Sequence, residues 1–255
     1  MDVLKGRVVI VALSIAVAAS LFAQTGGVQQ NSYTAEFKVS RERTLADGST
    51  DVERLTEVRA RDSQHRLFIS AATAPEAGRS PSVTQVLVFD SVARNYLSWS
   101  VPGDRVVITP LLDLDELSRI CASKEPIGSR PSAPKAVSKP KNVDLGKDTI
   151  AGVEARGSRE IKTIYVEGSS GLRKVTHTRE VWTTTDPSLG LFFVKIVIDD
   201  PGIEKFTEEL DHFEPYEPYP TMFQPPQGYE IVSRPADQAP CPPVLEPDLL
   251  KPPAW

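Results

Sequence analysis

Alternation of apolar and polar side chains with a period of two is the pattern that most restricts the fold of this chain. Between residues 33 and 40, Tyr33, Ala35, Phe37 and Val39 alternate with polar residues. This pattern is typical of a β-strand with one face buried and the other in water. Similar extended segments are predicted at 50–62, 66–71, 83–89, 95–100, 105–109, 143–157, 161–166, 174–184, 191–198 and 203–213.

Short turn sequences separate these segments and predict how the strands connect. Asp47-Gly48 suits a tight hairpin, because glycine accepts a positive φ. Asp186-Pro187 and Asp200-Pro201-Gly202 mark two later turns. Sequential strands usually pair, so we predict a meander of about nine or ten strands. The predicted fold class is mainly β, with a curved antiparallel sheet or half-barrel and one short helix.

The predicted helix spans residues 111–122, where the period changes from two to three or four. Leu114, Leu117 and Cys121 fall on one side, and Asp113 with Glu116 resembles a helix-start box. A Pro/Lys-rich linker at 123–142 follows, with four Pro and five basic residues. Residues 233–255 contain seven Pro and are predicted to form an extended tail.

The first 23 residues resemble a signal peptide. Lys5 and Arg7 precede a run from Val8 to Phe22 that carries no charge. This run is shorter than the roughly 20 residues that a membrane-spanning helix needs. We therefore expect cleavage after Ala23, export to the periplasm or the extracellular space, and no transmembrane segment after cleavage. The remaining organisation is one β-rich domain at 24–232, interrupted by the linker.

The net charge and the cysteine content indicate which partners and which cellular compartment suit this chain. The net charge is −5, so the chain gains nothing from counterion release on nucleic acid, and we expect no nucleic-acid partner. The two cysteines, Cys121 and Cys241, are able to form a disulfide in an oxidising compartment. A buried free thiol at Cys121, on the apolar side of the predicted helix, is the open alternative. The sequence leaves the oligomeric state undetermined.

Known catalytic and metal-binding motifs are missing from the sequence. There is no GxSxG, HExxH or GxxxxGK[ST] pattern. The three histidines, His65, His177 and His212, lie far apart in sequence, with no spacing that suggests a zinc site. We therefore predict no catalytic residue, no cofactor and no metal ligand, and expect that the protein is not an enzyme.

Aromatic side chains are spread over several predicted strands. Inside a curved sheet, Trp99, Trp182 and Phe192 are candidates to line a cavity for an apolar ligand. The same residues are equally suited to fill an ordinary core, and the pattern alone leaves both interpretations open.

Several short motifs resemble a known group of proteins. They are Arg61-Asp62-Ser63 with Arg66, Leu145-Gly146 with Ile150, Gly152, Ala155, Gly157 and Arg159, Glu180 with Trp182, and Glu217-Pro218 with Phe223, Pro226, Gly228 and Tyr229. In this order they resemble an uncharacterised family of exported bacterial β-rich proteins. The sequence departs from that pattern at His65, where the turn is expected to hold a glycine.

More distantly, the layout is similar to periplasmic lipoprotein-carrier and sensor domains of the LolA and RseB kind. That resemblance implies a half-barrel of antiparallel strands, with helices over its hollow, that binds acyl chains. We therefore predict an exported, non-enzymatic binding module for a lipid or other apolar ligand in the cell envelope. Two alternatives stay open: an envelope structural protein that binds a protein partner through its Pro-rich tail, and a hydrolase with an unrecognised site.

Overall fold

The computed structural model describes residues 31–45, 47–73, 84–111, 139–168, 171–189, 193–201 and 204–235. The predicted signal peptide, the helix beyond Leu111, the linker up to residue 138 and the tail from residue 236 lie outside the described residues. Those predictions therefore remain predictions.

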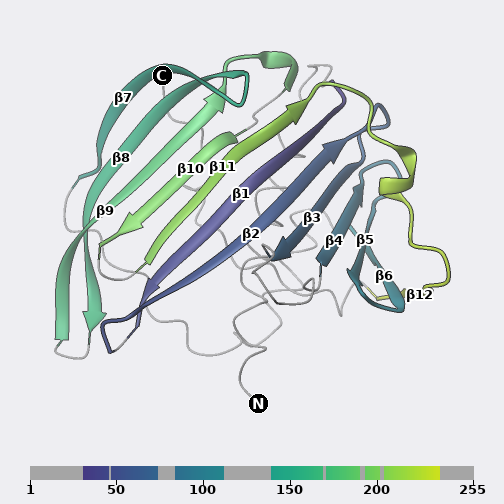
Figure 1. Cartoon of the computed structure of the whole chain (residues 1–255), viewed down its shortest axis with the longest axis horizontal. Helices are drawn as coiled ribbons and strands as arrows, with labels where there is room; N and C mark the ends of the chain where they lie inside the picture. Colours follow the sequence, from purple (N-terminus) through teal and green to yellow (C-terminus); the bar gives the residue numbers. More distant parts are fainter. Residues whose placement is uncertain are drawn as a thin grey trace. The chain divides into compact units, whose positions relative to one another are not determined.

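Twelve strands make up most of the described structure (Figure 1). They are β1 (Tyr33–Thr44), β2 (Thr50–Arg61), β3 (Leu67–Thr73), β4 (Thr84–Asp90), β5 (Asn95–Val101), β6 (Arg105–Pro110), β7 (Lys141–Ile150), β8 (Val153–Gly168), β9 (Gly171–Thr184), β10 (Phe193–Asp200), β11 (Glu204–Glu214) and β12 (Glu230–Ser233). Two 3₁₀ turns, η1 (Pro187–Leu189) and η2 (Pro220–Phe223), are the helical elements in this part of the chain.

The strands pair in the order β12-β6-β5-β4-β3-β2-β1-β11-β10-β9-β8-β7, which leaves β12 and β7 as edges. The β3–β4, β4–β5, β5–β6, β7–β8, β8–β9, β9–β10 and β10–β11 pairs are antiparallel. The predicted mainly β class, built on an unclosed antiparallel sheet, is confirmed. One strand was not predicted: β12 pairs with β6 in parallel, from Glu230 opposite Arg105 to Ser233 opposite Ile108.

Contacts within the chain define two compact units. Unit 1 consists of residues 1–35, 57–125 and 214–255, and unit 2 of residues 36–56 and 126–213. Strands β1 and β2 each contribute residues to both units.

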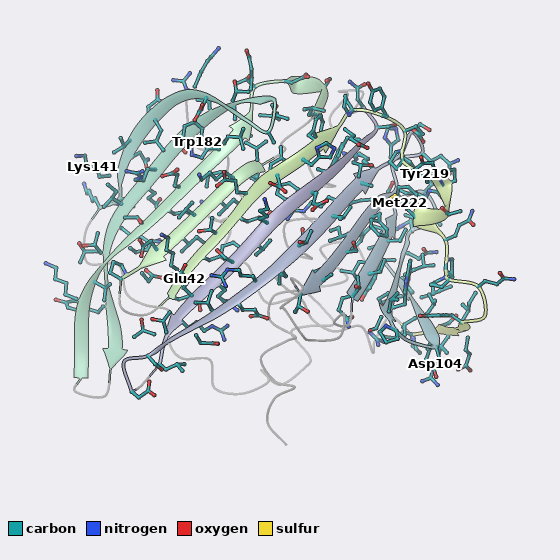
Figure 2. All side chains as sticks on the ribbon, in the orientation of Figure 1. Glu42, Asp104, Lys141, Trp182, Tyr219 and Met222 are labelled. Carbon is teal, nitrogen blue, oxygen red and sulfur yellow. The ribbon has the colours of Figure 1, made fainter. Side chains whose placement is uncertain are left out.

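The sheet in unit 1 carries apolar side chains on both faces. On one face, Phe68 and Trp99 belong to a buried cluster that Phe223 of η2 completes, and the rings of Phe68 and Phe223 meet edge to face at 6.3 Å. Met222, labelled on η2 in Figure 2, packs against the same cluster. The other face carries a second cluster, consisting of Leu67, Ile69, Leu87 and Phe89.

Unit 2 is built on long hairpins. Strands β7, β8 and β9 bend along their length in Figure 1, and β7 contains a bulge between Asp144 and Gly146. Gly146 adopts a φ of +79°, which glycine accepts without steric cost. The apolar segment predicted at 191–198 contains the start of β10, whose Val194 and Ile196 are buried.

Candidate functional site

The motif at residues 61–66 forms the turn between β2 and β3 in unit 1. One oxygen of Asp62 accepts hydrogen bonds from the backbone N–H groups of Gln64 and Arg66. The other oxygen pairs with the Arg66 guanidinium at 2.6 Å. Ser63 donates its backbone N–H and its hydroxyl to Glu217, which belongs to the C-terminal motif. The structure therefore joins two motifs that lie about 150 residues apart in sequence.

Further contacts hold the C-terminal motif against this turn. The Arg66 guanidinium lies 4.7 Å from the centre of the Phe223 ring, within range of a cation–π interaction. Hydrogen bonds from Ser32 and Ser63 lower the pKa of the Glu217 carboxyl below its ordinary value. The turn and the end of β2 are thus fixed from several directions.

Strand β2 buries the face on which its charged residues lie. Alternation puts Glu57, Arg59 and Arg61 on one face, and Val58 and Ala60 on the other. The three charged residues are only 1%, 4% and 7% exposed. Burial of this kind is rare for charged side chains unless they are paired.

The pairing of the strands continues this face across unit 1. The Asp62 N–H donates to the Arg66 carbonyl, which sets Arg61 opposite Leu67 on the neighbouring strand. Leu67 then pairs with Phe89, Phe89 with Tyr96, and Tyr96 with Thr109. We call these five residues the cross-sheet row. Phe89 and Tyr96 stack with their ring centres 5.6 Å apart.

We call the whole surface that contains this row the arginine face. It carries the cross-sheet row, Arg59, Ile69 and Leu87. Its middle is apolar, and its β2 side carries Glu57 together with Arg59 and Arg61. At both ends of the row a buried polar atom has no hydrogen-bond partner among the described residues: Nε of Arg61 and Oγ1 of Thr109. Thr109 is 0% exposed.

Tyr33 of β1 also interacts with the arginines of this face. Burial raises the pKa of the Tyr33 hydroxyl, although Arg59 and Arg61 oppose that change. Burial also lowers the pKa of the Arg61 guanidinium, and Tyr33 and Asp62 act in the opposite direction. An arginine keeps its positive charge under such conditions, so the face holds a buried cation beside a neutral phenol.

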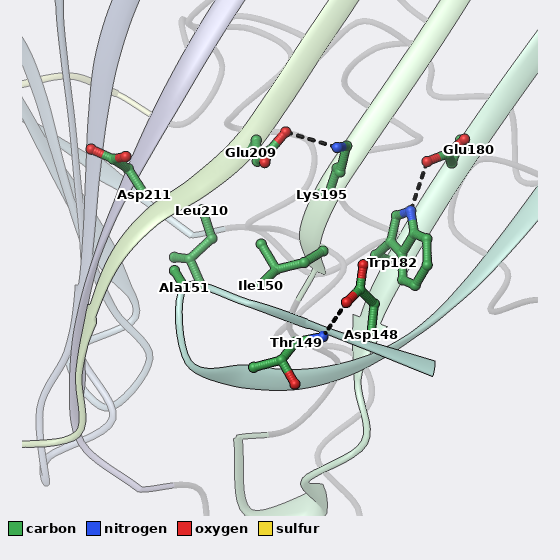
Figure 3. A pocket seen from close by; sticks show the side chains of 10 residues that line it. All are labelled: Asp148, Thr149, Ile150, Ala151, Glu180, Trp182, Lys195, Glu209, Leu210 and Asp211. Carbon is green, nitrogen blue, oxygen red and sulfur yellow. Dashed lines mark hydrogen bonds and ion pairs between the residues drawn. The ribbon is translucent and has the colours of Figure 1, made fainter. Parts of the chain in front are cut away.

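A pocket of about 380 Å³ lies in unit 2 (Figure 3). Its polar lining includes four carboxylates, and the full set is Asp148, Thr149, Ile150, Ala151, Glu180, Trp182, Lys195, Glu209, Leu210 and Asp211. Its volume falls in the range of small-molecule sites, but its acidic lining differs from the apolar lining that such sites usually have.

Ion pairs already occupy most of the charges around this pocket. Lys195 pairs with Glu209 at 2.9 Å, and Lys38 pairs with Asp211 at 2.6 Å. The Trp182 indole N–H donates to Glu180 at 2.7 Å, as the dashed line in Figure 3 shows. The pocket therefore offers a poor surface to an apolar chain.

The structure places the predicted lining residues in separate environments. Trp99 is buried in the cluster of unit 1 that includes Phe223. Trp182 lines the polar pocket of unit 2. Phe192, Cys121 and Cys241 lie outside the described residues. A ligand lining made of Trp99, Trp182 and Phe192 stays a prediction.

The three histidines occupy different places. His65 is in the β2–β3 turn, His212 is exposed on β11, and His177 of β9 shares a 2.7 Å hydrogen bond with Asp200. His177 does not line the pocket of Figure 3. Among the residues that the structure describes, no group of three or more His, Cys, Asp or Glu side chains is arranged to hold a metal ion.

The sequence reasoning missed the arginine face. Alternation places Glu57 and Arg59 on the face opposite Val58, but it does not indicate that the charged face is buried. The available signal was the run Thr56 to Arg61, in which every second residue from Glu57 is charged while the residues between them are small or apolar. Such a run separates the two faces of the strand, but it does not show that the charged face is buried as well as the apolar one.

Comparisons with known proteins give matches among solved structures alone. No known family matches by its sequence profile, and no curated protein matches the chain. A LolA superfamily protein from Nitrosomonas europaea is 10% identical with a TM-score of 0.32, over 82% of this chain and 96% of its own. The Mycobacterium tuberculosis lipoprotein LppX is 14% identical with a TM-score of 0.32, over 77% of this chain and 92% of its own.

A domain from Vibrio parahaemolyticus, described as a putative outer membrane lipoprotein-sorting protein, is 8% identical with a TM-score of 0.27. That match covers 80% of this chain and 92% of the domain. The matched structures include a protein described as a LolA superfamily member, the kind of protein to which the layout of the sequence is distantly similar. Across the described ranges, no helix is both long enough and apolar enough to span a membrane.

Proposed function

We propose that this chain is an exported, non-enzymatic binding module that holds the apolar body of a lipid-like ligand on the arginine face of unit 1. The cross-sheet row carries this proposal. Its middle consists of Leu67, Phe89 and Tyr96, and a buried polar atom without a partner stands at each end.

An ordinary core is expected to satisfy its buried polar groups. More than nine in ten such groups find a hydrogen-bond partner, and an unsatisfied one costs roughly 1–3 kcal/mol. Arg61 and Thr109 depart from that rule on one face of one unit. A ligand with an apolar body and polar ends supplies the missing partners, which an apolar filling of the face does not.

Binding of a neutral apolar probe tests the proposal. Fluorescence of 1-N-phenylnaphthylamine should rise when the purified, delipidated protein is added, because the probe enters an apolar site. Leu87 and Val88 are neighbours on β4 that belong to clusters on opposite faces. Leu87→Ala should weaken probe binding at least fivefold, whereas Val88→Ala should leave it unchanged.

Both substitutions are expected to lower stability, by about 2–5 kcal/mol for Leu87→Ala and less for Val88→Ala, so binding is compared at a temperature where both variants are folded. Equal binding by the two variants would contradict the assignment to this face. Absence of any fluorescence increase with the unaltered protein would contradict the proposed function as a whole.

Export is tested separately. The protein recovered from the envelope fraction of its own host should have the mass of a chain whose first residue is Gln24. Native mass spectrometry of the same sample should show a bound lipid. Recovery of the uncleaved chain from the cytoplasm would contradict export.

A further inference from the structure

We propose that the ligand is an anionic amphiphile, whose single carboxylate or phosphate group binds the Arg61 guanidinium while its chain lies along Leu67, Phe89 and Tyr96. This inference rests on the proposed function, because it names the chemical class of the ligand that the arginine face holds. It selects fatty acids or lipid phosphates over neutral lipids.

Two of the three arginines at 59–66, at the end of β2 and in the turn after it, pair with a described carboxylate. Arg59 pairs with Glu57 at 2.5 Å, and Arg66 pairs with Asp62 at 2.6 Å. Arg61 makes no ion pair with any of the described residues, and its Nε lacks a hydrogen-bond partner although the residue is 93% buried. A buried charge without a counterion is costly, so the site favours an incoming anion.

Nearby groups do not neutralise this cation. Tyr33 lies close enough to interact with Arg61, but burial raises the pKa of its hydroxyl, which therefore stays neutral at pH 7. The Asp62 carboxylate is already bound by Arg66 and by two backbone N–H groups. Guanidinium is well suited to the open position, because its planar donors match a carboxylate or a phosphate.

The cross-sheet row supplies the site for the chain of the same ligand. It runs perpendicular to the strands from Arg61 on β2 to Thr109 on β6. Four strand spacings of about 4.8 Å separate the two ends by roughly 19 Å. Leu67, Phe89 and Tyr96 lie between them and form an apolar stretch, in which Leu67 and Phe89 are only 4% exposed.

Displacement of 1-N-phenylnaphthylamine by three ligands with the same chain provides the test. Oleate, oleyl phosphate and oleyl alcohol are titrated into the purified, delipidated protein below their critical micelle concentrations. One or both anions should displace the probe at a concentration at least about tenfold lower than the alcohol, as expected for a charge-assisted hydrogen bond. Whichever of oleate and oleyl phosphate displaces the probe at the lower concentration identifies the preferred headgroup, carboxylate or phosphate.

Arg61→Met removes the charge but keeps an unbranched side chain of similar length. It should reduce the preference for anions over oleyl alcohol to less than about twofold. The control is Arg105→Met, which removes an exposed arginine of unit 1 that pairs with Glu230 at the surface. This control variant should keep the same preference for anions over oleyl alcohol as the unaltered protein. Should Arg61→Met fail to fold, Arg61→Lys keeps the charge without the planar fork and should lower the preference severalfold.

Three outcomes separate the two claims. Equal displacement by oleate, oleyl phosphate and oleyl alcohol in the unaltered protein would overturn the anion site and leave the apolar-binding function standing. A full preference for anions in the folded Arg61 variant would also overturn it. Failure of the probe and of all three ligands to bind would overturn the proposed function itself.

Discussion

At the scale of single residues, His65 occupies a turn position whose backbone conformation favours glycine. His65 has a φ of +63°, in the left-handed region that favours glycine. The resemblance noted from the sequence expected a glycine here, and the backbone gives the physical reason. We predict that His65→Gly raises the free energy of unfolding by roughly 1 kcal/mol, measured by urea denaturation.

His65→Ala provides the matched control. It removes the imidazole but keeps a Cβ in the left-handed conformation, so we expect it to give no increase in stability. If both variants are stabilised equally, the effect belongs to the lost imidazole and not to the backbone.

Gly157 is constrained by a side chain rather than by its own φ. A Cβ at this position would lie 2.6 Å from the Trp182 ring, which faces it from the neighbouring strand β9. We predict that Gly157→Ala lowers the free energy of unfolding by about 1–3 kcal/mol, because the indole must move. The same substitution in a Trp182→Leu background should cost less than half as much. An equal cost in both backgrounds would contradict this explanation.

At the scale of elements, the hairpins were the part most accessible to sequence reasoning. Asp47-Gly48 and the alternating residues from Tyr33 to Val39 each follow from a local rule that tertiary structure did not override. Strand β12 is different, because its four residues pair with β6, which lies over 100 residues earlier, and no local signal indicates such a partner. The arginine face was missed for a related reason, since burial of β2 depends on which distant strands cover it.

The contact between the C-terminal motif and the β2–β3 turn depends on the ionised form of Glu217. Its folded-state pKa is lowered, so its contribution to stability is present above the unfolded pKa and is lost as pH falls through the lower, folded value. We predict that Glu217→Gln slightly lowers the urea midpoint at pH 7 and that the difference from the unaltered protein disappears in strong acid. Glu42→Gln, at an exposed position in unit 2, serves as the control and should show no such pH-dependent difference. A Glu217→Gln deficit that persists at acid pH would show that the amide disrupts the contact for another reason.

At the scale of the whole molecule, two units share two strands. Because β1 and β2 contribute residues to both units, neither unit is a continuous stretch of sequence. Composition and periodicity are read along the chain, so they do not indicate which distant segments gather into one unit. The candidate site depends on the same property, because its row draws residues from five strands that only the assembled sheet brings together.

The two cysteines provide the last prediction, and it concerns the longest covalent loop that this chain is able to form. Cys121 and Cys241 are 120 positions apart, and closing a loop of that length removes much of the freedom of the unfolded chain. After export we expect them to be bridged, so that the denatured, unreduced protein takes up no iodoacetamide while the reduced protein takes up two equivalents. Reduction should then lower the free energy of unfolding by on the order of 4–5 kcal/mol. Labelling of both cysteines in denaturant without a reductant would instead establish free thiols, and Cys121→Ser would then change stability through local packing alone, with no effect from added reductant.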